Sequence, residues 1–116
     1  MSDLPTDFVW IPEQPIQVDM TMADGVFIKQ IIVPKAGTYI PQHAHTYDHT
    51  SMLALGSARI WKDGVLLGDF VAPKALIIEA NTKHTFLALV DGTMVYCIHN
   101  VSRSGVMEIA EEHNLT

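Results

Sequence analysis

The feature that most constrains the fold is a series of short apolar runs separated by turn signals. Seven runs rich in β-branched and aromatic residues recur at residues 26–33, 50–55, 58–62, 65–71, 76–79, 84–90 and 93–99. Asp63-Gly64 and Asp91-Gly92 each separate two runs, and this dipeptide favours tight hairpins because glycine tolerates a positive φ. Many short strands at regular spacing are typical of a sandwich or barrel. The sequence therefore predicts an all-β domain.

Two segments flank this series, and we expect both to belong to the same domain. Residues 1–25 begin with a stretch that carries three prolines, which predicts an extended arm or edge strand. Residues 101–116 contain a short helical pattern at 106–113 and are expected to form a terminal cap. A chain of 116 residues fits one domain, so the barrel itself is expected at residues 26–100.

Composition and charge exclude several classes of partner. The chain carries 7 Lys and Arg against 13 Asp and Glu, a formal charge of −6, and its basic residues are scattered singly. Nucleic acid and anionic membranes both require clustered positive charge, so neither is an expected partner. The apolar runs fall far short of the ~20 residues that span a bilayer. A single cysteine and an N-terminus without signal-peptide features predict a cytoplasmic protein.

Histidines crowd one short segment of the sequence. His43, His45 and His49 lie within seven residues, and His84 follows a turn signal at residues 81–83. Residues two apart on a strand project from one face, so the first two histidines can point together into a barrel. Imidazoles from two strands at one level can supply three or four nitrogen ligands to one divalent ion. This spacing predicts a metal site.

The segment from Gly37 to Gly56 resembles the first sequence motif of the cupin superfamily. Its pattern is Gly, five residues, His43-x-His45, three residues, His49, six residues, Gly, and His49 stands where the family usually has a glutamate. Residues 73–84 resemble the second motif, with His84 at the position of its last ligand. Four departures from that motif replace its usual Gly, Asp, Pro and Gly: they are Lys74, Ala75, Glu79 and Asn81.

The resemblance implies a small single-domain cupin, or monocupin. Its fold would be a double-stranded β-helix, also called a jelly-roll barrel, and such proteins are often dimeric, so a homodimer is expected. The implied ligands of one divalent transition-metal ion are His43, His45, His49 and His84. A histidine in place of the carboxylate leaves this set neutral, so the full charge of the cation would act on bound water or substrate. Imidazole suits zinc, iron, nickel, manganese and copper alike, which leaves the metal open.

Two functions remain open at this point. One is a metalloenzyme, of oxygenase, isomerase or lyase type, that acts on a small metabolite coordinated in the barrel. The other is a non-catalytic binding or structural protein in which the metal staples the barrel; small cupins of this kind also occur in bacteriophage genomes. Few charged groups are expected to face inward, the basic candidates being Lys29 and Arg59, and this scarcity favours the second function weakly.

Several other residues are candidates for supporting roles. His99 could donate a hydrogen bond to a metal ligand or act as a general base, or it could be a hydrogen-bonded structural histidine, and the structural role is favoured. Cys97 is expected to be a buried packing thiol, because nothing around it shows both the base and the orienting group of a nucleophile. Carboxylates beside the ligand positions could act as acid or base or face solvent, and three tyrosines could orient a ligand or pack. These residues are Asp48, Glu79, Tyr39, Tyr47 and Tyr96.

Overall fold

Nine β-strands make up the computed structural model, which describes residues 16–41 and 44–100. The strands are β1 (Gln17–Ala23), β2 (Val26–Val33), β3 (Tyr39–Pro41), β4 (His49–Leu55), β5 (Ser57–Lys62), β6 (Val65–Val71), β7 (Lys74–Ile78), β8 (His84–Ala88) and β9 (Thr93–Asn100). The described residues contain no helix, so the prediction of an all-β fold is confirmed. They also contain no helical segment with the length and hydropathy needed to cross a bilayer.

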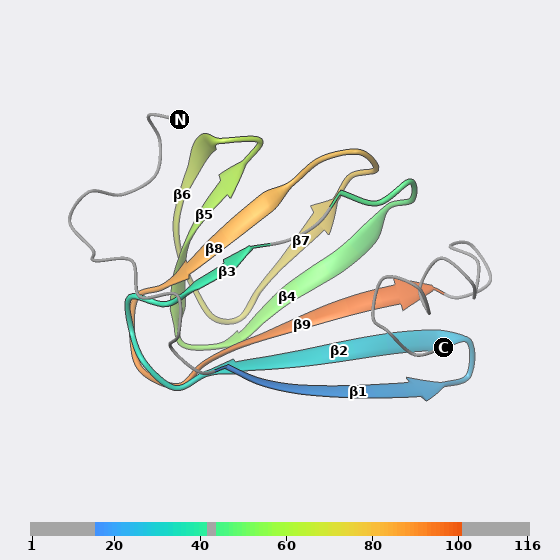
Figure 1. Ribbon diagram of the computed structural model, residues 1–116, viewed down its shortest axis with the longest axis horizontal. Coiled ribbons are helices and arrows are strands. Elements are labelled where there is room, and N and C mark those ends of the chain that lie inside the picture. Colours follow the sequence, from blue (N-terminus) through green and yellow to red (C-terminus); the bar gives the residue numbers. More distant parts are fainter. Residues whose placement is uncertain (1–15, 42–43, 101–116) are drawn as a thin grey trace.

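The strands form two antiparallel sheets that face each other (Figure 1). The larger sheet has the order β1-β2-β9-β4-β7, and the smaller one has the order β3-β8-β5-β6. After β2 the chain passes from one sheet to the other and back, so that β4, β7 and β9 join the larger sheet on separate returns. This winding is that of a jelly-roll barrel. The fold predicted from the motifs is therefore confirmed.

One of the two hairpins expected from Asp-Gly pairs is formed, between β5 and β6. Asp63 has a φ of 49° and Gly64 a φ of 83°, between β5 and β6. Gly92 has a φ of 75°, but the strands that it connects, β8 and β9, lie in different sheets, so the hairpin expected at Asp91-Gly92 is not formed. A third pair, Asp24-Gly25, makes a hairpin turn between β1 and β2, with φ values of 51° and 75°. Positive φ at both central residues matches the right-handed twist of the flanking strands.

The barrel interior is filled with apolar side chains over much of its length. One contiguous buried cluster draws on both sheets and consists of Ile31, Val33, Ile40, Leu53, Ala58, Ile60, Phe86, Ala88, Val95 and Cys97. Alternation along each strand places these residues inward and leaves the intervening side chains outside. Residues 17–23, at the end of the N-terminal segment, form the edge strand β1. Residues 1–15, with most of the expected arm, and the expected cap at 101–116 lie outside the described residues.

Candidate metal centre

Three described histidines meet at one end of the barrel. His49 is the first residue of β4, His99 lies near the end of β9, and His45 lies in the segment that leads into β4. The ring centroids of His49 and His99 are 4.5 Å apart, and the planes are stacked at 18°. His45 meets both rings edge-on, at 5.1 Å from His49 and 5.6 Å from His99. The structure therefore brings two of the predicted ligands together with a histidine that was expected to be structural.

Strand register explains why His49 and His99 lie side by side. β4 and β9 pair antiparallel with Thr50 opposite Ile98 and Ser51 opposite Cys97. The same register sets His49 across from His99 on the inward face of the sheet. Both side chains are buried, with exposed fractions of 6% and 1%. Residues fifty positions apart in the sequence therefore share one level of the barrel.

Two aromatic rings pack against this histidine cluster. The ring of Tyr47 stacks on His45 at 5.0 Å and lies 5.6 Å from His99. Phe27, at the start of β2, lies 5.7 Å from His99. Tyr47 and Phe27 are both buried and pack as a small apolar cluster of their own. These rings fix the imidazole planes and keep water away from them, which strengthens any electrostatic interaction made there.

His84 lies on the opposite sheet. It is the first residue of β8, is 2% exposed and pairs across the strands with Lys62 of β5. Among the described residues it makes no ring contact with the other histidines, and its buried Nδ1 has no hydrogen-bond partner. Burial, and next the positive charge of Lys62, hold the pKa of His84 below its ordinary value. The neutral ring that results is the form that binds a metal.

The segment that carries His45 is tied to the turn that precedes His84. The backbone N–H of Asn81 donates to the carbonyl oxygen of His45 at 2.6 Å. The N–H of Ala80 donates to Oδ1 of Asp48 at 2.7 Å. Of the two carboxylates considered as acid or base, Asp48 therefore joins the two loops. The other, Glu79, pairs with Lys62 at the exposed rim.

A polar layer lies directly beneath the imidazoles. Ser51 Oγ donates to Cys97 Sγ at 3.7 Å, and Lys29 of β2 is the cross-strand neighbour of Cys97. Burial raises the pKa of the Cys97 thiol, which agrees with a packing role. Lys29 therefore faces inward as expected. Arg59 does not, because it alternates with the buried Ala58 and Ile60.

The outward position of Arg59 corrects one expectation from the sequence. Its Nε donates to Oδ1 of Asp69 at 2.7 Å, in an ion pair on the outer face of the smaller sheet. The hydrogen bond from Arg59 holds the pKa of Asp69 below its ordinary value. On the same strand, the basic group that does lie beside a predicted ligand is Lys62, which faces the same side as its neighbour His84. To predict which side chains of β5 point into the barrel, one would need to know how β5 pairs with β8.

The histidines fit a divalent transition metal in donor chemistry but are not oriented as a formed site. In residues 16–41 and 44–100, no three His, Cys, Asp or Glu side chains are placed to hold an ion together. A ligating lone pair lies in the plane of the imidazole, so the stacked rings of His49 and His99 cannot both aim at one point. His43, the remaining predicted ligand, lies outside the described residues.

For two members of the cluster, the sequence analysis favoured a structural or packing role and did not predict their place beside the ligands. His99 and Tyr47 complete the group of rings around His45 and His49. The alternation of His99 with the buried Cys97 gives a signal that it faces inward. That His99 lies beside His49 follows from the pairing of β4 with β9, and this pairing cannot be deduced from one sequence.

Comparison with solved structures identifies the fold. The chain is similar to KdgF from Halomonas sp., with a TM-score of 0.63 and 15% identity over 76% of this chain and 80% of that one. A cupin superfamily protein from Desulfitobacterium hafniense matches with a TM-score of 0.63, at 17% identity over 84% and 94%.

An RmlC-like cupin from Desulfovibrio desulfuricans matches at 18% identity over 86% and 96%, with a TM-score of 0.63. No protein-family model matches the sequence, and no curated protein matches it either. At these identities the likeness shows the fold alone. The described residues of this chain have the cupin fold, a double-stranded β-helix.

Proposed function

We propose that this protein binds one divalent transition-metal ion at the histidine end of its barrel and acts there as a small cytoplasmic metalloenzyme. One observation carries the proposal: the rings of His45, His49 and His99 lie within 5.6 Å of one another in a largely buried cluster. Clustered imidazoles are unusual packing units, because their nitrogens favour water, hydrogen bonds or a metal. The neutral donors of this cluster suit a divalent transition ion.

The ligands we propose are His43, His45, His49 and His84. His84 supports this assignment, because its buried Nδ1 has no hydrogen-bond partner among the described residues and burial favours its neutral form. His99 acts as a positioning residue. Its ring covers one face of His49 and limits how far that ring can turn. A bound divalent ion would supply Lewis-acid or redox chemistry at this position.

The surrounding residues suit a small polar or aromatic substrate. Tyr47 and Phe27 exclude water from the imidazoles and offer ring faces to a planar group. Lys62 lies at the rim next to His84, where its ammonium group can bind a substrate carboxylate or phenolate. The layer of Ser51, Cys97 and Lys29 gives the floor of the site polar groups that a metal staple would not require.

A second candidate function is supported by the packing of the barrel. Ile, Val, Leu and Phe side chains fill the interior beyond the polar layer and leave room for chemistry at the histidine end alone. In this alternative the metal joins the two sheets, and the protein has a binding or structural role without catalysis. A phage-associated role belongs to this candidate. The two candidates differ in whether a coordination position stays open to exogenous ligands.

Elemental analysis of the purified protein tests the metal site. We expect about one divalent transition ion per chain and its loss from His43→Ala combined with His84→Ala, because removing two ligands breaks the site. His113→Ala is the matched control, a histidine outside both motifs, and should keep the metal. Full metal content in the double variant would overturn the assignment.

Two substitutions at His99 separate positioning from ligation. His99→Ala removes the ring stacked on His49 and should weaken metal binding ~10–100-fold. His99→Phe keeps a ring there and should bind nearly as tightly as the unaltered protein. Equal losses in both variants would instead make His99 a ligand. Titration with cobalt, followed by its visible spectrum, measures both affinities.

The same cobalt-loaded protein distinguishes the two functions. A bidentate aromatic or anionic ligand such as catechol or oxalate should change the visible spectrum if coordination positions remain open. A spectrum that stays constant at saturating ligand would favour the metal staple and count against the enzyme.

A further inference from the structure

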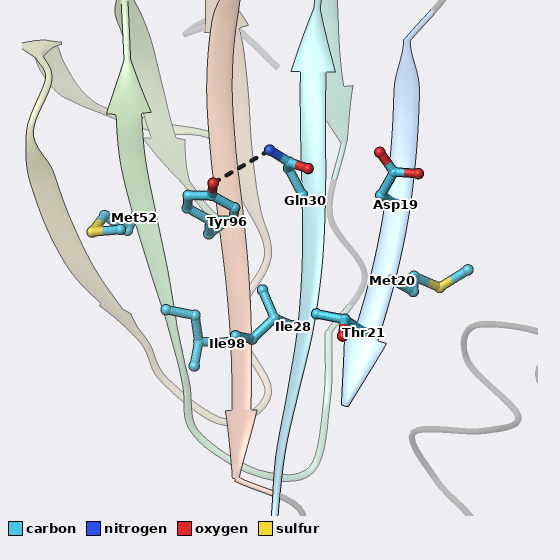
Figure 2. A pocket seen from close by; sticks show the side chains of 8 residues that line it. All are labelled: Asp19, Met20, Thr21, Ile28, Gln30, Met52, Tyr96 and Ile98. Atoms are coloured by element: carbon cyan, nitrogen blue, oxygen red, sulfur yellow. Dashed lines mark hydrogen bonds between the residues drawn. The ribbon is translucent and has the colours of Figure 1, made fainter. Parts of the chain in front are cut away.

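Lys29 is the charged residue that β2 turns toward the barrel interior. Figure 2 shows Ile28 and Gln30 beside Tyr96 on the outer face of the larger sheet, so Lys29, between the first two, faces the opposite way. The other inward positions of β2 are buried and apolar, and they are Phe27, Ile31 and Val33. A charged residue in such a row breaks the pattern of a packed strand, and breaks of this kind are expected at functional sites.

Solvent reaches the interior beside Lys29. The residue is half-buried although it faces inward, and its neighbour on β1, Met20, is 43% exposed. On its other side Lys29 is paired with the buried Cys97 of β9. The ammonium group therefore lies where the barrel opens from its apolar packing toward water, and a small ion can reach it.

Lys29 lies one level below the histidine cluster. Burial raises the pKa of the Cys97 thiol most strongly, while the hydrogen bond from Ser51 and the positive charge of Lys29 act in the opposite direction. One step along the inward face of β2, Phe27 pairs with His99, and their ring centroids are 5.7 Å apart. Two residues along a strand span about 7 Å. A small metabolite is therefore long enough to reach from Lys29 to the imidazoles.

Lys29 has no carboxylate partner in the part of the chain that the structure describes. The ion pairs within that part join other residues, Arg59 to Asp69 and Lys62 to Glu79. A charge that is partly removed from water costs free energy when it has no counter-ion, and lysine is rarely buried without one. An anion that enters the barrel would supply this counter-ion.

The proposed metal centre adds to the positive charge. Its imidazole ligands are neutral, so they balance neither the two charges of a divalent ion nor the charge of Lys29. Two carboxylates near the histidines have other partners: Asp48 accepts from the backbone N–H of Ala80, and Glu79 pairs with Lys62. A site with excess positive charge attracts small anions.

A carboxylate suits this position better than a phosphate. A phosphate monoester carries nearly two negative charges and three acceptor oxygens. Proteins usually bind it with arginine or with the N–H groups at the start of a helix. The described residues contain no helix, and Arg59 points out of the barrel. One ammonium group matches one carboxylate in charge.

We propose that Lys29 binds a carboxylate of the substrate while oxygen atoms at the other end of the same molecule coordinate the metal. This inference rests on the proposed function and narrows its substrates to small carboxylic acids with a second, metal-binding oxygen group. Lys29 would then determine specificity and orientation. Lys62, whose ammonium group is already paired with Glu79, would act at the rim.

Two probes that differ by one carboxylate test this inference. Catechol coordinates a metal through adjacent hydroxyl groups, and protocatechuate is catechol with a carboxylate on the far side of the ring. Titration of the cobalt-loaded protein with each probe, followed by its visible spectrum, gives two dissociation constants. In the unaltered protein protocatechuate should bind about 10–100-fold more tightly, because a hydrogen bond to a charged group is among the stronger ones. In Lys29→Met, which removes the charge and keeps an unbranched side chain, the two probes should bind alike.

Lys35→Met is the matched control. Lys35 is exposed beyond the far end of β2, so its substitution changes the net charge equally and should preserve the difference between the probes. Lys29→Gln, which keeps a polar side chain, should lose the difference as Lys29→Met does, and circular dichroism shows that each variant is folded.

Three outcomes would contradict these proposals in different ways. A difference that survives in folded Lys29→Met and Lys29→Gln would overturn the role of Lys29 and leave the metal site intact. Loss of the difference in Lys62→Met instead would make the rim lysine the anchor and also overturn it. A cobalt spectrum that neither probe changes would overturn the proposed enzyme, and this inference with it.

Discussion

Substituting Gly56 by alanine is expected to destabilise the protein by about 3 kcal/mol, from roughly 1–2 kcal/mol for an L-residue in the left-handed region and roughly 1–3 kcal/mol for overpacking. Gly56 lies between β4 and β5 with a φ of 85°. A Cβ there would lie 2.5 Å from Oγ1 and 2.9 Å from Cα of Thr93. Thr93 is fully buried and its hydroxyl donates to the carbonyl oxygen of Val90, so it cannot move aside cheaply.

Gly25→Ala is the matched control for this prediction. Gly25 has a similar φ of 75°, but nothing lies within 4 Å of its added Cβ, so it should lose the backbone contribution alone. Thermal unfolding measures the difference, since each kcal/mol lowers the midpoint by roughly 4–8 °C in a domain of this size. Equal losses at Gly25 and Gly56 would contradict the steric argument and leave only the backbone conformation as the cause.

Removal of the metal is expected to have an effect of similar size. A ligand that binds only the folded state stabilises it by about 4 kcal/mol when its free concentration is 1,000 times its dissociation constant. Dialysis against a chelator should therefore lower the midpoint of thermal unfolding by roughly 15–30 °C. Adding the ion back should restore it. Lower pH should have the same effect as the chelator, because protons compete with the ion for the imidazole nitrogens.

The control for chelation is His49→Ala, which should unfold at the same temperature with and without the chelator. An unaltered protein that loses its ion without any change in midpoint would show that the folded state does not depend on metal. The metal would then have no stabilising role, and the alternative in which it only joins the two sheets would be excluded.

Sequence patterns predicted the architecture because the strands are bounded by local signals. The Asp-Gly pair at residues 63–64 makes a hairpin turn, and the pair at 91–92 marks the end of β8, although the chain there passes to the other sheet and forms no hairpin. The three-residue strand β3 has no such signal and is too short to show alternation. β1 alternates polar and apolar residues, yet its position at the sheet edge follows from pairing with β2 and not from its composition.

The candidate site was less accessible to sequence reasoning, because it is assembled by strand pairing. The spacing of His45 and His49 could be read directly, whereas the contact of His49 with His99 depends on the register of β4 and β9. Arg59 was placed inward by composition and lies outward by alternation with its neighbours. Side-chain direction relative to the barrel is a property of the sheet, which the chain specifies only through long-range packing.

The hydrogen bond from Asn81 to His45 makes the position of each histidine-bearing segment depend on the other. Residues 44–48 and 79–83 hold each other through backbone atoms and through Asp48. A chimaera that imports only one of these segments from another barrel would break those bonds and misplace both. The two segments form one transferable unit, and grafting this centre onto a new scaffold means moving them together.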